Sequence, residues 1–172
     1  MDGKQTNLSV KDIALISILT AILFVQEQLL TNIPGIQLTI LLMVLYSKKM
    51  GMFKTVLIII IHVLLDNFVM SSFSLMYTPT MLVGWLIIPL TLCTIFKKVE
   101  SPVILAILGA ILAFIYCWLY MIPSYLIYNI KPLAYLLSDI IAEIILAGCS
   151  FLTIIFLYKP SSKLLDSLIK LH

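Results

Sequence analysis

Arginine is absent from the sequence, and only 11% of its 172 residues are charged. Soluble globular domains carry about a quarter charged residues, so this scarcity of charge excludes a soluble domain. The regular alternation of polar and apolar residues that builds membrane β-barrels is also missing. Hydrophobic residues instead make up 62% of the chain, and the mean hydropathy is +1.16. The composition therefore predicts an all-α membrane protein, and we expect the lipid bilayer but no nucleic acid among its partners.

The motifs of common catalytic and nucleotide-binding sites are missing as well. The chain has no glycine-rich phosphate loop, no HExxH motif and no serine, histidine and aspartate in a catalytic order. It therefore cannot hydrolyse ATP by itself, and we expect neither an enzyme nor a bound cofactor. The three cysteines, Cys93, Cys117 and Cys149, lie in apolar runs without metal-ligand spacing. We expect them to be packing residues rather than disulfides or metal ligands.

What the chain does contain is a series of apolar stretches, which predict membrane-spanning helices. We expect residues 1–172 to form one substrate-binding domain of six transmembrane helices. The predicted spans are Leu8–Leu30, Ile36–Ser47, Phe53–Val69, Thr78–Phe96, Pro102–Ile122 and Pro132–Tyr158. The second span is short, and the "NIPG" before it predicts a broken or re-entrant entry. No small-residue cleavage site follows the first span, so we expect it to be retained.

The lysines predict the orientation of these spans. A six-span arrangement places ten of the eleven on one side of the membrane, and only Lys131 on the other. The ten are Lys4, Lys11, Lys48, Lys49, Lys54, Lys97, Lys98, Lys159, Lys163 and Lys170. Because basic residues concentrate in cytoplasmic segments, both termini are predicted to be cytoplasmic. The chain is then a multi-pass protein of the cell membrane, expected to be a bacterial plasma membrane.

Four acidic residues lie inside the predicted spans, whereas Asp2, Asp12, Glu100 and Asp166 fall among the cytoplasmic lysines. At 1.5 Å per helical residue, Asp66 lies about 18 Å beyond Lys54 and hence in the outer half of the membrane. The same reasoning predicts that all four lie at this depth on three helices: Glu27, Asp66, Asp139 and Glu143. Each alone could pair with a neighbouring helix, but ionisable residues in a membrane usually mark a substrate or ion path.

Aromatic and amide side chains surround these acids in the sequence, which is the pattern of a small-molecule site. The candidate substrate-binding residues are Glu27, Gln37, Asp66, Asn67, Tyr77, Trp85, Trp118, Tyr120, Asp139 and Glu143. An interfacial aromatic belt is the alternative for the tyrosines and tryptophans. Several acids and one outer lysine favour a cationic or donor-rich substrate over a polyanion. For His62, a hydrogen bond between helices and a proton-linked role both stay open.

The order of these features resembles the S-components of energy-coupling factor (ECF) transporters, which are small six-helix vitamin-binding membrane proteins. The opening "VKDIALISILTAILF" resembles their lysine-led first helix, with Ser17 and Ala21 where the family usually has two alanines. The segment "NIPGIQLTILLMVLYSKKMG" resembles their first outer loop and short second helix, which closes on a glycine turn, here Gly51. The ending "LYKPSSKLLDSLIK" resembles their exit into a short cytoplasmic amphipathic tail. The resemblance covers nearly the whole chain.

The resemblance implies a division of labour. The chain would capture a vitamin-like small molecule from outside, and a transmembrane coupling subunit with two ATPase subunits would supply the energy. Ser17 and Ala21 would dock the coupling subunit, because small residues let helices approach closely; packing within this chain is the alternative. Two other functions stay open, a stand-alone proton- or sodium-coupled transporter and an assembly protein without a ligand.

Overall fold

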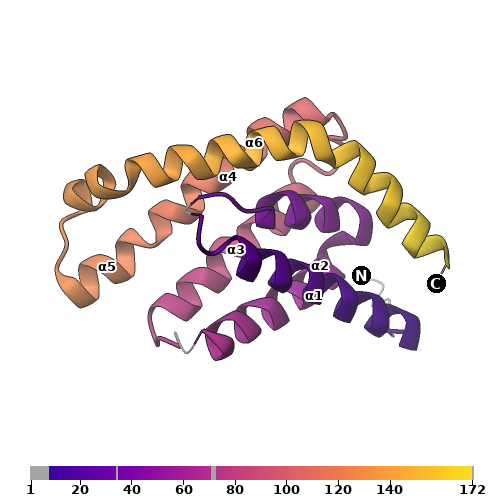
Figure 1. Cartoon of the computed structure of the whole chain (residues 1–172), viewed down its shortest axis with the longest axis horizontal. Helices are drawn as coiled ribbons and strands as arrows, with labels where there is room; N and C mark the ends of the chain where they lie inside the picture. The colour runs from indigo at the N-terminus through magenta and orange to yellow at the C-terminus, as the bar shows by residue number, and fades with distance from the viewer. Residues whose placement is uncertain (1–7, 34, 71–72, 172) are drawn as a thin grey trace.

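Helices are the only regular elements in the computed structural model, which describes residues 8–33, 35–70 and 73–171. They are α1 (Val10–Leu30), α2 (Thr39–Val69), α3 (Tyr77–Cys93), α4 (Pro102–Leu119), α5 (Met121–Tyr128) and α6 (Pro132–Leu171), shown in Figure 1. The predicted all-helical class is confirmed. Asp2 and Lys4 lie outside the described residues.

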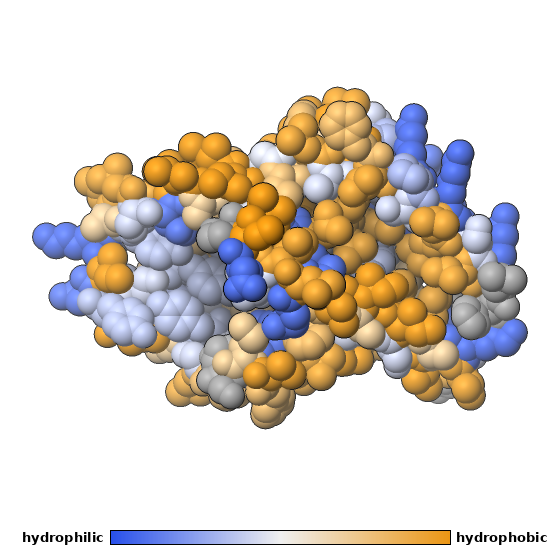
Figure 2. Space-filling model, viewed as in Figure 1, coloured by the Kyte–Doolittle hydropathy of each residue, from blue (hydrophilic) through white to orange (hydrophobic). Residues whose placement is uncertain are grey.

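Within the part of the chain that the structure describes, four helical segments are long and apolar enough to cross a membrane. They are Val10–Leu30, Thr39–Val69, Pro102–Tyr128 and Pro132–Lys170, whereas α3 is apolar but shorter. Large apolar side chains cover much of the surface of the molecule (Figure 2). In water such a surface would drive aggregation, but in a bilayer it meets hydrocarbon. The protein is therefore a helical membrane protein.

A capping box starts α1. The Ser9 hydroxyl accepts a hydrogen bond from the backbone N–H of Asp12 at 3.1 Å, and the Asp12 carboxylate accepts one from the backbone N–H of Ser9 at the same distance. These two bonds satisfy backbone donors that the first helical turn would otherwise leave unpaired. They fix the helix start two residues after the Leu8 expected from the apolar pattern.

The second helix is a hairpin of two arms that meet at Gly51. Gly51 has φ 78° and ψ 176°, which is not a helical conformation. It lies between the two spans expected at Ile36–Ser47 and Phe53–Val69. Along the first arm, Thr39 contacts Gln26 and Tyr46 contacts Leu19, so this arm runs antiparallel to α1. Along the second arm, Lys54 pairs with Asp12 and Asp66 contacts Gln28, so it runs parallel to α1. The chain therefore reverses its direction at Gly51.

The first arm of α2 lies at the centre of the helix assembly. The side chains of Ile40, Met43, Val44 and Tyr46 are each at most 1% exposed. The Tyr46 hydroxyl donates to the backbone carbonyl of Leu19 at 3.2 Å, which satisfies its polar tip within this apolar core. Burial on all sides explains why this short arm is almost uniformly apolar.

Two prolines shape the last helices. Pro123 lies within α5, which continues the direction of the chain beyond α4 to Asn129, a residue in the left-handed conformation with φ 55°. Pro160 lies inside α6, which extends to Leu171 rather than ending at the expected Tyr158. The helix curves toward its C-terminal end in Figure 1, as proline bends rather than stops a helix whose neighbours hold it. The expected separate tail is thus the end of α6.

Lysines and their partners gather at one end of the molecule. Lys49 pairs with Asp166 at 2.7 Å, and Lys54 pairs with Asp12. The Lys48 ammonium donates to the backbone carbonyl of Phe96 at 2.6 Å and to that of Leu92 at 3.4 Å, which satisfies the C-terminal end of α3. The start of α1 and the end of α6 lie at this end (Figure 1), where blue side chains cluster in Figure 2. We call it the lysine end.

The reversal at Gly51 generates a stability prediction. A Cβ at Gly51 would meet no atom within 4 Å, so a substitution there is strained only by its backbone angles. Because this conformation is essentially restricted to glycine, Gly51→Ala should cost about 1–3 kcal/mol. Gly148→Ala is the matched control, since a Cβ there also meets nothing within 4 Å and alanine favours a helix over glycine.

Thermal unfolding in detergent measures both variants. Gly51→Ala should melt below the wild type, and Gly148→Ala should melt at or above it. Equal melting temperatures for Gly51→Ala and the wild type would show that the turn does not need glycine.

Candidate functional site

A cleft opens near the end of the molecule opposite the lysine end. Its volume is about 380 Å³, within the range of small-molecule pockets. It is lined by Glu27, Asp66, Asn67, Ser74, Tyr77, Met81, Tyr116 and Tyr120. These residues come from α1, the second arm of α2, α3 and α4 with the short joints beside them, so four helices meet around the cleft. Figure 2 shows pale, weakly polar side chains around a hollow toward this end.

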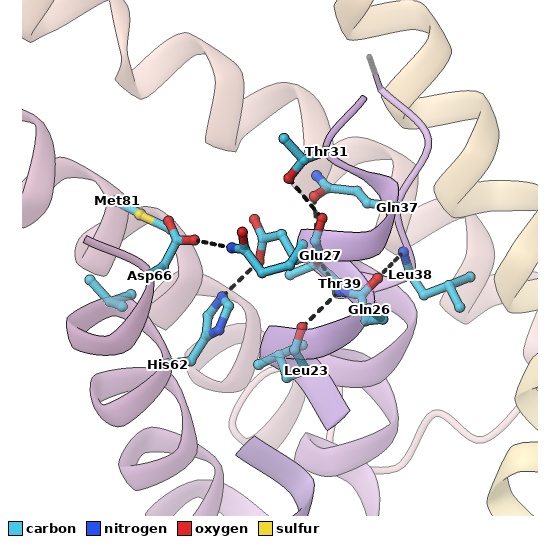
Figure 3. A network of polar contacts seen from close by, with 12 residues as sticks. Leu23, Gln26, Glu27, Thr31, Gln37, Leu38, Thr39, His62, Asp66 and Met81 are labelled. Atoms are coloured by element: carbon cyan, nitrogen blue, oxygen red, sulfur yellow. Dashed lines mark hydrogen bonds and ion pairs between the residues drawn. The ribbon is translucent and has the colours of Figure 1, made fainter. Parts of the chain in front are cut away.

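A buried histidine underlies the acidic side of the cleft. His62 is 0% exposed, and its Nε2 lies 2.9 Å from Glu27 Oε2 (Figure 3). The distance is that of an ion pair, but the contact does not have hydrogen-bond geometry. Within the described residues, neither ring nitrogen of His62 makes a well-directed hydrogen bond, and Glu27 Oε2 also lacks one. Polar atoms buried this way are costly unless a charge or a ligand compensates them.

The second acid of the cleft, Asp66, lies one helical turn after His62 on α2. Its Oδ1 accepts a hydrogen bond from Gln28 Nε2 at 3.0 Å. Among the described residues, no lysine lines the cleft. Two carboxylates therefore share one small space with a single imidazole behind them.

Asn67 has a different role from its neighbour Asp66. It is 4% exposed, its Oδ1 accepts from the Thr78 hydroxyl at 2.7 Å, and its Nδ2 donates to the Val63 carbonyl at 2.8 Å. The Thr78 hydroxyl in turn accepts from the backbone N–H of Ser74 at 3.1 Å. Asn67 thus ties α2 to the start of α3 and fixes the position of the cleft wall.

Three tyrosines, Tyr77, Tyr116 and Tyr120, form an aromatic wall of the cleft, and Trp85 lies behind them. Trp85 is fully buried and stacks on Tyr116, with ring centroids 3.9 Å apart and an interplanar angle of 21°. Tyr120 directly follows α4, one turn after Tyr116, and the hydroxyls of the two tyrosines are 2.8 Å apart. Tyr77 packs against Tyr120 at 5.9 Å. Such a wall suits a planar ligand.

Gly84 makes room for this stack. A Cβ at Gly84 would lie 2.6 Å from Cδ2 of Tyr116, which is closer than carbon atoms approach. The sequence therefore needs glycine there for the Tyr116 ring to lie against α3. The Trp85 indole nitrogen has no hydrogen-bond partner among the described residues.

Gln37, a predicted site residue, lies in the loop between α1 and α2 and does not line the cleft. Its Oε1 accepts from the Thr39 hydroxyl at 3.2 Å. Gln26 holds the same loop, because its Nε2 donates to Thr39 Oγ1 at 2.8 Å and its Oε1 accepts from the backbone N–H of Leu38 at 2.9 Å (Figure 3). These amides fix the start of α2.

Three other predicted site residues lie between α4 and α6 rather than around the cleft. The Trp118 indole donates to Glu143 Oε2 at 3.1 Å, and Glu143 is 0% exposed. The Tyr135 hydroxyl lies 3.5 Å from Asp139 Oδ2. Trp118 is itself 48% exposed. The four acids therefore form two groups. Tyr116 and Trp118 lie on different faces of α4: the face of Tyr116 borders the cleft, and the face of Trp118 meets α6 at Glu143. Only Glu27 and Asp66 line the cleft.

The residues expected to dock a partner lie on the surface of α1. Ser17 and Ala21 are exposed, and the Ser17 hydroxyl donates to the carbonyl of Ile13 at 2.9 Å. This bond satisfies the hydroxyl within its own helix. Because both side chains are small, they make a shallow depression in an apolar face of α1.

Of the predicted substrate-binding residues, the structure brings five to the cleft, namely Glu27, Asp66, Asn67, Tyr77 and Tyr120. Trp85 supports the aromatic wall from behind. The predicted set omitted His62, Ser74, Met81 and Tyr116. His62 and Asp66 are four residues apart and therefore lie on one helical face, so the position of Asp66 could have indicated that His62 also lies near the site.

Across residues 8–33, 35–70 and 73–171, no group of three or more His, Cys, Asp and Glu side chains could hold a metal ion. Comparisons of the chain with models of protein families, with curated proteins and with solved structures found no match.

Proposed function

We propose that this protein is the substrate-capture subunit of an ATP-driven uptake transporter of the ECF type. It would bind a vitamin or related small heterocycle from outside the cell. The observation that carries the proposal is the cleft of Glu27 and Asp66 with its aromatic wall at the end opposite the lysine end. A pocket of this size, with aromatic walls and a few converging polar groups, is typical of small-molecule recognition.

The proposed topology has six crossings of the cell membrane, with both termini in the cytoplasm. The two arms of α2 count as separate crossings, because their contacts with α1 run in opposite directions. The remaining crossings are α1, α3, α4 together with α5, and α6. The lysine end faces the cytoplasm under the positive-inside rule, and the cleft then faces outward.

The chemistry at the two ends supports this assignment. At the lysine end Lys48, Lys49 and Lys54 all bond to carbonyls or carboxylates of neighbouring segments. At the cleft and directly beneath it, Glu27 Oε2 and the ring nitrogens of His62 lack well-directed hydrogen bonds within the described part of the chain. Unsatisfied polar groups at a cleft are what a binding site offers before its ligand arrives.

The energy would come from partner chains, a transmembrane coupling subunit and two ATPases. Ser17 and Ala21 support a docking face on α1, since both are exposed on a helix surface. Van der Waals packing of small residues is the main attraction between helices in lipid.

A stand-alone proton-coupled transporter is the second candidate, and the buried pair of His62 and Glu27 favours it. Such a transporter would take up its substrate in cells that lack the coupling subunit and the ATPases. An assembly protein without a ligand would release no small molecule when the purified protein is denatured.

A prediction on ligand binding compares two acids. The test ligand is the small molecule released on denaturing purified protein and identified by mass spectrometry. Asp66→Asn should raise its dissociation constant about tenfold or more, because a hydrogen bond to a charged group contributes about 1.5–3 kcal/mol. Glu143→Gln is the matched control and should change the constant less than about twofold, since Glu143 does not line the cleft and glutamine keeps the shape and an acceptor oxygen for the Trp118 indole.

Titration calorimetry in detergent measures both constants, with melting curves to confirm that the variants fold. An unchanged constant in Asp66→Asn, or an equal loss in both variants, would contradict the assignment of the cleft. So would purified protein that releases no small molecule at all.

A further prediction concerns coupling to the partner subunits. Ser17→Leu combined with Ala21→Leu should abolish uptake in cells that express the coupling subunit and ATPases, while ligand binding by the purified variant stays unchanged. Leucines there would hold a partner helix away and remove close contacts, whereas the cleft lies near the other end of α1. Normal uptake by the double variant would show that this face does not dock a partner.

A further inference from the structure

His62 has no part in the capture function as proposed so far, yet it lies directly beneath the cleft. Its ring is 0% exposed and its Nε2 is 2.9 Å from Glu27 Oε2, the oxygen that no hydrogen bond satisfies. In Figure 3 the ring points from α2 toward Glu27 of α1. An imidazole in this position neutralises the carboxylate only when it carries a proton.

The charges around the cleft show what else could neutralise these acids. The ionisable side chains that line this space are Glu27 of α1, Asp66 of α2, Tyr77 of α3, and Tyr116 and Tyr120 of the α4 segment. His62 of α2 lies directly behind Glu27. The other lining residues, Asn67, Ser74 and Met81, are uncharged. Among the described residues, His62 is therefore the one group at the cleft that can supply a positive charge to Glu27 and Asp66.

We propose that the cleft takes a planar organic cation whose charge replaces the proton on His62, so that binding releases a proton and tightens as the pH rises. This inference rests on the proposed capture function and specifies its substrate class. An amidinium, guanidinium or protonated aminoheterocycle has N–H donors that match carboxylate oxygens. Its flat face fits against Tyr116, whose ring is held by Trp85.

Competition between the two positive charges follows from the geometry. A ligand cation bonded to Glu27 lies within a few ångströms of the imidazole, because Glu27 Oε2 already contacts Nε2. Two positive charges at that separation repel strongly where protein and lipid exclude water. The imidazole therefore gives up its proton to solvent, and Glu27 and Asp66 balance the ligand charge instead.

The probes are 4-fluorobenzamidinium, a flat cation that does not titrate near neutral pH, and 4-fluorobenzamide, its neutral isostere. Fluorine NMR of each probe with purified protein gives dissociation constants, and empty detergent micelles give the background partition. The wild type should bind the amidinium about tenfold or more tightly than the amide at about pH 7.5. Equal binding of the two probes, or no binding of the amidinium above background, would overturn the cation assignment.

The same titration at about pH 5.5 and about pH 7.5 tests the proton linkage. For the wild type, amidinium binding should tighten at least about fivefold at the higher pH, since one linked proton changes a binding constant by up to tenfold per pH unit. His62→Gln keeps a nitrogen donor near the position of Nε2 but cannot titrate. In this variant the change should fall below about twofold.

Two results would overturn the role of His62. A wild type whose amidinium affinity does not change with pH releases no proton on binding. If the amidinium affinity of the His62→Gln variant keeps the full pH dependence of the wild type, protonation of Glu27 or Asp66 and not of His62 causes that dependence. Failure of this inference is distinguishable from failure of the capture function, because a released neutral heterocycle that binds the cleft would support capture and refute only the cation.

Discussion

The lack of water in the bilayer interior is the constraint on which the rest of this structure depends. Backbone groups there must bond within helices, and each polar side chain must find a protein partner or reach an aqueous opening. Several hydroxyl groups donate hydrogen bonds to the backbone carbonyls four residues earlier, namely those of Ser17, Thr20, Ser47 and Thr55. Glu143 is bonded by Trp118. Among the described residues, the exceptions are Glu27 Oε2, both ring nitrogens of His62, Trp85 Nε1 and Glu143 Oε1. Of these, Glu27 and His62 lie at or directly beneath the cleft, where a ligand or a proton can complete them.

The same constraint divides the molecule into two chemically different ends. At the lysine end, ammonium groups from the hairpin of α2 bond to α1, α3 and α6, so charge there holds helices together. At the other end, two carboxylates share a cleft that none of the described lysines lines, so the charge there is left for something outside the chain. The aromatic stack of Trp85 and Tyr116 gives that cleft a rigid wall, and Gly84 provides the space in which the stack forms.

Sequence patterns predicted the features that follow from hydrophobicity and local chemistry. The apolar runs predicted the helical class. The break between two apolar runs and the glycine turn predicted the change of direction at Gly51. Depth along the helices predicted that Glu27 and Asp66 lie close together. The sequence patterns could not predict that Asp139 and Glu143 lie outside the cleft, because the depth of a residue in the membrane does not specify which neighbouring helix its side chain faces. Only packing fixes that rotation, and here it turns Glu143 toward Trp118. The end of α6 was missed because Pro160 bends a helix that Asp166 and Lys49 hold in place.

The central claim is that the acidic cleft opens outside the cell while the lysine end lies inside, and cysteine labelling tests it most directly. Ser74 lines the cleft and Ser162 lines a cavity at the lysine end, and each is replaced by cysteine in a background without Cys93, Cys117 and Cys149. A membrane-impermeant maleimide applied to intact cells should label the cysteine at position 74 and spare that at 162, which should react only after lysis. Labelling of position 162 but not position 74 in intact cells would contradict the account.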